Sequence, residues 1–284
     1  MTDKANAVMP TGRVLILLDG SRLSLAALEA AAEIAAGRNA EVLGIFVEEI
    51  NLLRTAGYGF AQEIGGSSGL SRPLETAALE ARMQAQAEQA RRALRQTMVR
   101  RGLVQTLQLC RGRVAEEVLR LIQPEDLVVL GRAGWSAIHG TRLGSTARTL
   151  LRQAPGEVLL WTELRPERQS RVVVLLNHDQ GASHRALRVG AELARRSQQP
   201  LSVLIRSQPE EDQALVEDLV RYLQQEGITA RVKRIATGSA GAAVRALQEE
   251  GASQLVVSRT SSLFADQGAE VLLSELNLPI TVTP

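Results

Sequence analysis

The strongest constraint on the fold is an internal repeat, because four blocks of the first half recur in the same order in the second half. RVLILLDGS from Arg13 matches RVVVLLNHD from Arg171, and AAEIA at 31–35 matches GAELA at 190–194. The other two pairs are DLVVLGR ending at Arg132 with SQLVVSR ending at Arg259, and LLRQAPGEVLL from Leu150 with LLSELNLPITV from Leu272. Such ordered matches indicate two tandem copies of one domain.

The two copies differ in length and are joined by a polar segment. The first copy is longer, and most of its extra residues fall between residues 49 and 100. The joining segment, TELRPERQS at 162–170, is polar and contains Pro166, as is typical of interdomain linkers. We therefore predict one domain at residues 1–162 and a second at residues 170–284.

Each copy reads as strands alternating with helices. Short, continuous apolar runs are typical of strands that are buried on both faces of a parallel sheet. Residues 13–18 are such a run, and we expect further strands near 41–47, 104–110, 126–131 and 157–161, and again near 171–176, 201–206, 229–235, 254–258 and 279–283. The pattern predicts an α/β fold with two tandem open parallel-sheet domains, Rossmann-like or flavodoxin-like, with five strands each and helices on both faces.

The helices of the first copy have recognisable ends and faces. The first helix is expected to begin after the capping residue Ser21 and to end at Gly37. Further helices are expected near 75–101, 113–122 and 145–153. Residues 51–74, which are rich in glycine and serine, read as a flexible excursion after the second strand.

Composition and charge exclude several classes of function. A net charge of +2 and an aromatic content of 2% argue against a nucleic-acid partner and a base-stacking surface. Lysine occurs only at Lys4 and Lys233, which excludes a phosphate loop that depends on lysine. No apolar run approaches the ~20 residues of a membrane span, so no membrane insertion is expected. One cysteine, Cys110, and an N-terminus without a secretory pattern favour the cytoplasm.

The segment after the fourth strand, LGRAGWSAIHGTRLGST, carries the strongest functional signal. Glycines let a ligand approach the backbone closely, and the first N–H groups of the helix that follows attract anions. Arginines on the intervening loop are suited to neutralising phosphate charge. The segment therefore predicts a phosphate site without lysine, against the alternative that the glycines only end a strand, make a turn and start a helix. Its key residues are Gly131, Arg132, Gly134, His139, Arg142, Gly144 and Ser145.

Other polar and aromatic residues lie where a site is expected. Asp19 ends the first strand at the carboxyl edge of the sheet, where open parallel sheets bind ligands. Its carboxylate could accept hydrogen bonds from a ribose or a base, or cap the next helix. Glu48 and Glu49 are candidates for a metal on the phosphates or for a solvated surface. Tyr58 and Phe60 are candidates for a lid over the base or for packing under a long loop.

RVLILLDGS, GIFVEE and the spacing G-x2-G-x9-G-[S/T] resemble the universal stress protein family over essentially the whole chain. The resemblance implies the adenine nucleotide alpha hydrolase-like variant of the fold. It also implies binding of ATP, with ADP or AMP as alternatives and Mg2+ on the phosphates. In that family an aspartate, a valine and the first glycine of the motif contact the nucleoside, which implies the same contacts for Asp19, Val47 and Gly131. The family's phosphate-binding positions correspond to Gly134, Gly144, Ser145 and Thr146, which implies that these residues hold the phosphates.

The resemblance also bears on assembly. Members of the family usually pair through their last strands, which implies that residues 157–161 pair with residues 279–283 of the same chain. It further implies a homodimer and a protein partner.

The second copy departs from this pattern. The altered positions carry Asn177 for the aspartate, Ser258 and Ser261 for the first two glycines, and Asp266 and Gln267 for the last glycine and serine. An aspartate at the start of a helix would repel a phosphate. We predict that the second domain is a degenerate universal stress protein domain that binds no ATP and acts structurally.

The expected function is therefore a nucleotide-regulated binding module of the stress response. Catalysis needs a nucleophile or general base within hydrogen-bond reach of the substrate, and the motif supplies only backbone donors, arginines and one carboxylate. Binding is favoured over turnover. The alternatives are a slow ATPase or other nucleotide-hydrolysing enzyme, and a purely structural dimerisation module.

Overall fold

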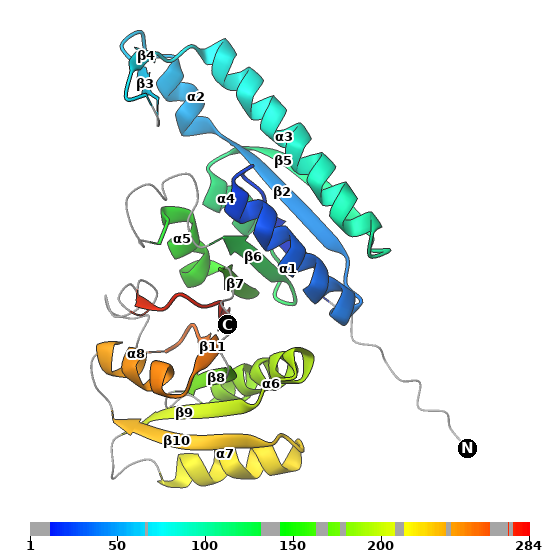
Figure 1. Cartoon of the computed structure of the whole chain (residues 1–284), viewed down its shortest axis with the longest axis vertical. Helices are drawn as coiled ribbons and strands as arrows, with labels where there is room; N and C mark the ends of the chain where they lie inside the picture. The colour runs from blue at the N-terminus through cyan, green and yellow to red at the C-terminus, as the bar shows by residue number, and fades with distance from the viewer. Residues whose placement is uncertain are drawn as a thin grey trace. The chain divides into compact units, whose positions relative to one another are not determined.

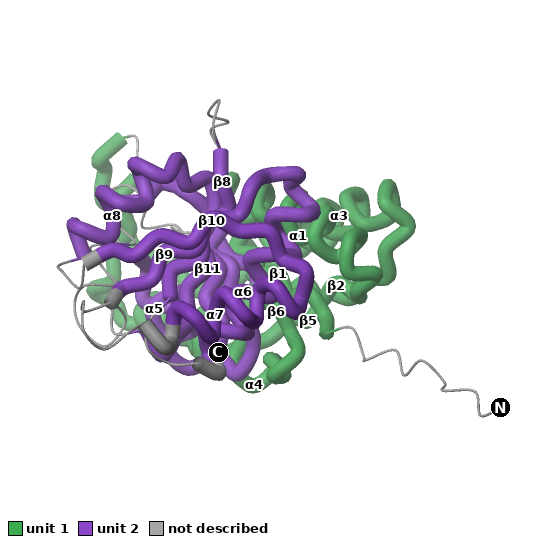
Figure 2. The backbone as a smooth tube through the Cα atoms, turned by 90° about the horizontal axis from the view of Figure 1, so that it is seen from below, with its two compact units in different colours: residues 1–128 green, residues 129–284 purple. Residues whose placement is uncertain are grey.

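The computed structural model describes residues 12–65, 68–131, 143–162, 170–176, 180–207, 213–236, 240–261, 272 and 275–284. The chain divides into two compact units, residues 1–128 and 129–284 (Figure 2). The domain boundary predicted at 162–170 falls largely on residues 163–169, which lie outside the described part, so the domain limits stay a prediction.

The first unit is built on parallel strands, as the apolar runs predicted (Figure 1). The strand order is β6-β1-β2-β5. Its strands are β1 (Val14–Leu17), β2 (Val42–Glu49), β5 (Gln105–Gly112) and the start of β6 (Leu127–Gly131), and its long helices are α1 (Arg22–Arg38), α3 (Thr76–Val99) and α4 (Val114–Leu121). Gly44 of β2 allows helix α3 to pack closely on the strand. A Cβ at this position would lie only 2.7 Å from Leu94 Cδ2 of the helix.

Only one end of α1 lies where the sequence predicted it. Ser21 caps the helix as predicted, and its side chain accepts a 3.1 Å hydrogen bond from Ser24 N. The predicted end at Gly37 is wrong, since the helix continues to Arg38 and Asn39 takes the left-handed cap with φ 50°. Asparagine tolerates this conformation better than most residues, so the cap does not need the glycine.

The excursion at 51–74 contains regular structure that the sequence analysis missed. It holds helix α2 (Ile50–Ala56) and a hairpin of β3 (Gln62–Ile64) and β4 (Ser71–Pro73). The Glu49 carboxylate caps α2, accepting a 3.2 Å hydrogen bond from Asn51 N. Glu63 of β3 pairs with Arg72 and with Arg82, and the hydrogen bond from Arg82 is the main cause of its lowered pKa. The segment is thus held by local polar contacts at Glu49 and Glu63.

The second unit repeats the alternation of strands and helices. The strand order is β10-β9-β8-β11-β12-β7-β6, and the run from β10 to β12 is parallel. The strands are β7 (Glu157–Trp161), β8 (Arg171–Leu176), β9 (Leu201–Ser207), β10 (Ala230–Ala236), β11 (Ala252–Ser258) and β12 (Ile280–Thr283). The helices are α5 (Ser145–Gln153), α6 (Gln180–Ser197), α7 (Gln213–Gln225) and α8 (Ala240–Glu249).

Strand β8 shows why the sheet needs cover on both faces. Val172, Val174 and Leu176 share one apolar cluster with residues of α6 and α7. Val173 and Leu175 point the other way, because successive side chains of a strand alternate, and they are equally buried. Continuous apolar strands of this kind are stable only between two layers of helices.

The last strands of the two sequence copies pair with each other. β12 runs antiparallel to β7, with Ile280 opposite Leu160 and Val282 opposite Val158. This is the pairing that the sequence analysis expected for residues 157–161 and 279–283. It also explains why β7 belongs to the same compact unit as β8 to β12.

Arg259, which follows β11, holds the C-terminal end of α5. Its guanidinium donates to Leu151 O at 2.6 Å, to Gly156 O at 3.0 Å and to Ala154 O. Burial lowers the pKa of Arg259 from its ordinary value. One planar fork therefore satisfies three carbonyls at and beyond the last turn of the helix.

A second buried arginine contact ties the start of β1 to the start of β6. The Asp126 carboxylate is 1% exposed and accepts 2.7 Å and 3.2 Å hydrogen bonds from the Arg13 guanidinium. It also accepts backbone hydrogen bonds from Arg13 N at 3.0 Å and Gln123 N at 2.8 Å. The hydrogen bond to Asp126 is the main cause of the raised pKa of Arg13.

Within the part of the chain that is described, no helix combines the length and the apolar character that crossing a membrane requires.

Replacing Asp126 with alanine should lower the free energy of unfolding by about 3 kcal/mol, because a buried charge pair loses one partner and two backbone N–H groups lose their acceptor. Urea denaturation followed by circular dichroism measures the change. The control is Glu88→Ala, which removes the exposed 3.5 Å partner of Arg91 and should cost less than about 0.5 kcal/mol. Equal stability of the two variants would contradict the assigned role of Asp126.

Replacing Arg259 with lysine should destabilise the chain by about 2 kcal/mol, because an ammonium group cannot reproduce a fork that reaches three carbonyls. The matched control is Arg221→Lys at the exposed 2.6 Å pair with Asp218, where little change is expected. Thermal unfolding of both variants provides the measurement. A melting temperature of Arg259→Lys as high as that of Arg221→Lys would show that the fork is dispensable.

Candidate functional site

Asp19 and Val47 lie at the carboxyl edge of the first unit's sheet. The β1–β2 ladder ends at the pair Leu17 and Ile45, and Leu18 N still donates to Ile45 O at 2.9 Å. Asp19 and Val47 each lie two residues beyond this last pair. At Val47, strand β2 no longer pairs with β1 and, among the described strands, pairs only with β5. The two residues predicted to contact the nucleoside therefore share one edge.

The turn around Asp19 fixes its carboxylate. Asp19 Oδ1 accepts a 2.8 Å hydrogen bond from Ser21 N, and Asp19 N donates to Ser24 Oγ at 3.4 Å. Gly20 between them has φ +75°, a conformation that suits glycine. Asp19 thus stabilises the start of α1, while Ser21 performs the capping role that was the alternative for Asp19.

The structure describes only part of the predicted glycine motif. Gly131 is the last residue of β6, and Gly144, Ser145 and Thr146 form the start of α5. The predicted site residues Arg132, Gly134 and Arg142, together with His139, lie outside the described residues.

The start of α5 has the features of an anion-binding helix terminus. Gly144 is the N-cap residue with φ −63° and supplies no side-chain cap, so the N–H groups of the first turn have no capping partner from it. A Cβ added to Gly144 would meet no atom of the described part of the chain within 4 Å, and the neighbouring Ser145 is exposed. The Arg148 guanidinium donates to Leu143 O at 3.2 Å and 3.3 Å, which fixes the residue before the cap.

The two glutamates at the end of β2 have structural partners. Glu48 accepts a 2.7 Å hydrogen bond from Arg111 Nε, and this contact is the main cause of the raised pKa of Arg111. Glu49 caps α2 and also accepts from Val114 N, the first residue of α4, at 3.2 Å. Among the described residues, no cluster of three or more histidine, cysteine, aspartate or glutamate side chains is arranged to hold a metal.

Tyr58 and Phe60 stack on each other, with ring centroids 5.4 Å apart. They are 57% and 82% exposed, so they do not form the packing under a loop that was one of their two predicted roles. Their role as a lid stays a prediction.

Two serines are buried at the corresponding edge of the second copy. Ser258 and Ser261, which replace Gly131 and Gly134, are 8% and 3% exposed. They lie in a turn in which Ser261 N donates to Ser258 O at 3.0 Å and Ser258 Oγ lies 2.8 Å from Thr260 Oγ1. The other altered positions, Asn177, Asp266 and Gln267, lie outside the described residues.

Arg206 is a residue at this edge that the sequence analysis missed. Val14 and Val172 are aligned residues of the first strands, and their register partners are Val42 and Leu201. Counting along both second strands from these partners places Arg206 at the position of Val47. Arg206 is 7% exposed, and its burial lowers its pKa from the ordinary value. Aligning the second strands of the two copies residue by residue would have revealed the substitution.

Comparison with known proteins supports these assignments at the level of fold. The family model described as "Universal stress protein family" matches residues 10–161. A universal stress protein from Archaeoglobus fulgidus is similar at 16% identity and a TM-score of 0.72, over 97% of this chain and 99% of that chain. A putative universal stress protein from Pseudomonas aeruginosa is similar at 17% identity and a TM-score of 0.59, over 96% and 93%. No curated protein matches the chain.

The family match covers more than half of the 284 residues and includes both the turn at Asp19 and the start of α5. The two structural likenesses extend the fold over nearly the whole tandem pair. This chain belongs to the universal stress protein family.

Proposed function

We propose that this chain is a nucleotide-regulated module that binds one adenine nucleotide through its first domain. ATP is the proposed ligand, with ADP or AMP as alternatives, and the second domain acts structurally. The observation that carries the proposal is the start of α5, where a glycine cap leaves backbone donors and open space in front of a helix terminus.

Gly144 is informative because the protein itself does not require a glycine there. Its φ of −63° is available to any residue, and a Cβ would meet no described atom within 4 Å. Neither backbone strain nor packing against the described residues accounts for the glycine. A phosphate that approaches the helix terminus within hydrogen-bond distance would occupy that space, which supports a role in binding.

The phosphate donors of the proposed site are backbone amides and hydroxyls. The first-turn N–H groups of α5 point out of the helix and carry the positive end of its dipole. The side chains of Ser145 and Thr146 add two hydroxyl donors next to them. Arg132, Gly134 and Arg142 complete the phosphate site in this proposal. Mg2+ would arrive bound to the phosphates and keep most of its water ligands.

The nucleoside contacts of the proposed site come from Asp19, Val47 and Gly131. The hydrogen bond from Ser21 N orients the Asp19 carboxylate at the carboxyl edge, which suits it to accept a ribose hydroxyl. Val47 lies beyond the last β1–β2 pair, which suits its backbone to contact a base.

The proposal assigns no nucleotide to the second domain. Arg206 stands at the position of Val47, and two buried serines replace the glycines after β11. A guanidinium group at the base position and a filled turn at the ribose position would both oppose an adenine nucleotide. Cytoplasmic location, a homodimer and a protein partner that responds to nucleotide occupancy are further parts of the proposal.

Replacing Gly144 with alanine should weaken ATP binding at least about tenfold, because the methyl group occupies the space that the phosphate needs and one lost charge-assisted hydrogen bond is worth about 1.5–3 kcal/mol. Isothermal titration calorimetry measures the affinity. The melting temperature without ligand should not fall, since the methyl group meets no atom of the described residues within 4 Å.

The matched control is Gly59→Ala, where a Cβ also meets nothing within 4 Å and the residue lies outside the motif. It should leave ATP affinity unchanged. Wild-type affinity in Gly144→Ala would remove the main support for a phosphate at this helix terminus.

The number of nucleotide sites per chain distinguishes binding by the first domain alone from binding by both domains. Titration of the full chain with ATP should give one site per chain, because the second domain lacks the glycines and carries Arg206 at the base position. Mass spectrometry of the heat-released supernatant shows which adenine nucleotide accompanies the purified protein. Two equivalent sites per chain would contradict the assignment of the second domain as structural.

A further inference from the structure

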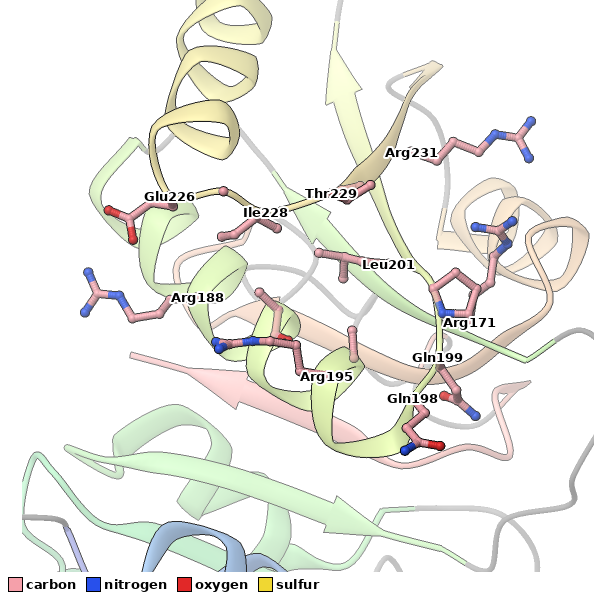
Figure 3. Close-up of a pocket in the computed structure, with 15 residues that line it drawn as sticks. Arg171, Arg188, Arg195, Gln198, Gln199, Leu201, Glu226, Ile228, Thr229 and Arg231 are labelled. Atoms are coloured by element: carbon pink, nitrogen blue, oxygen red, sulfur yellow. The ribbon is translucent and has the colours of Figure 1, made fainter.

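The second unit contains a groove of about 710 Å³ that the proposed nucleotide site does not use (Figure 3). It lies along α6 and at the amino ends of β8, β9 and β10, whereas open parallel sheets bind nucleotides at the carboxyl ends of their strands. Its size is within the range of about 300–1,000 Å³ that small-molecule sites occupy.

Four arginines line this groove. Arg188 and Arg195 are seven residues apart on α6, which places them on one face of the helix and about 10 Å apart along its axis. Arg171 opens β8, and Arg231 is the second residue of β10. Figure 3 shows Arg188 and Arg195 at one end of the groove and Arg171 and Arg231 at the other.

The positive charge of the groove is not balanced by its own residues. Glu226 is the one carboxylate among the lining residues that the structure describes. The contacts of the guanidinium groups are long, at 3.4 Å from Arg195 Nε to Ala191 O and 3.8 Å from Arg231 Nη1 to Glu250. For Arg188 no hydrogen bond or ion pair to another described residue is found.

Stabilisation of helix ends accounts for only one of these arginines. Arg195 lies in the last turn of α6, where a cation interacts favourably with the C-terminal dipole. Arg188 is two turns earlier, and Arg171 and Arg231 are on strands. Their convergence on one groove therefore needs another explanation.

The middle of the groove is apolar. Leu201 and Ala194 are 4% and 7% exposed, and Ile228 is half-buried beside them. In Figure 3, Leu201 and Ile228 lie between the two pairs of arginines. An apolar floor between cationic ends fits a ligand that has an apolar body and anionic groups.

We propose that this groove binds an organic phosphate with a compact apolar body, at a site separate from the nucleotide site. Arg188 and Arg195 bind the phosphate through charge-assisted hydrogen bonds, and the apolar body lies on Leu201 and Ile228. Arg171 and Arg231 accommodate a second anionic group where the ligand has one.

The test uses 1-naphthyl phosphate as the probe, titrated into the full chain by isothermal calorimetry in the presence of saturating ATP. Binding should be at least about tenfold stronger than that of 1-naphthol or of inorganic phosphate, because each lacks one of the two recognised parts. The double variant Arg188→Gln/Arg195→Gln should weaken probe binding at least about tenfold.

The matched control is Arg92→Gln/Arg95→Gln, which removes two exposed arginines from α3 and the same net charge. It should bind the probe as the wild type does. Equal binding by both double variants, or no binding by the folded wild type, would overturn the proposal. ATP affinity measured on the same variants should not change, so failure of the groove is distinguishable from failure of the nucleotide site.

Discussion

The position of α5 depends on one guanidinium group, because Arg259 donates to three carbonyls at and just beyond the C-terminal end of that helix. The arginine comes from the end of β11 in the second sequence copy, and α5 comes from the first. The antiparallel pairing of β12 with β7 brings these segments into one compact unit. Arg259 thus fixes the C-terminal end of the helix, and its N-terminal amides have no intrahelical partners.

The two copies show how one repeated architecture supports two different chemistries. In the first copy, glycine at position 144 leaves backbone donors accessible, and a short turn orients Asp19 at the sheet edge. In the second copy, buried serines and Arg206 occupy equivalent positions, while arginines gather at the opposite, amino edge of the strands. In the proposed functions, substitution of a few edge residues changes the ligand while the apolar strands keep the sheet unchanged.

Much of the fold was predictable, because strands buried on both faces leave continuous apolar runs in the sequence. Such runs mark the buried strands, β1 and β8 among them, and the family resemblance implied the pairing of β7 with β12. The hairpin and α2 were missed, because they depend on capping by Glu49 and on ion pairs of Glu63 rather than on apolar periodicity. The partners of Arg13 and Arg259 are distant in sequence, whereas Arg206 could have been found as the counterpart of Val47 by aligning the second strands of the two copies.

The central claim is that the first-turn amides of α5 receive the phosphates of a nucleotide. Amide hydrogen exchange, resolved by residue, tests it most directly when the full chain is compared with and without saturating ATP. The account predicts that the amides of Ser145, Thr146 and Ala147 exchange more slowly with ATP bound, while the amides of residues 267–269, which align with them in the second copy, do not change. Unchanged exchange at the start of α5 in a chain that demonstrably binds ATP would contradict the claim.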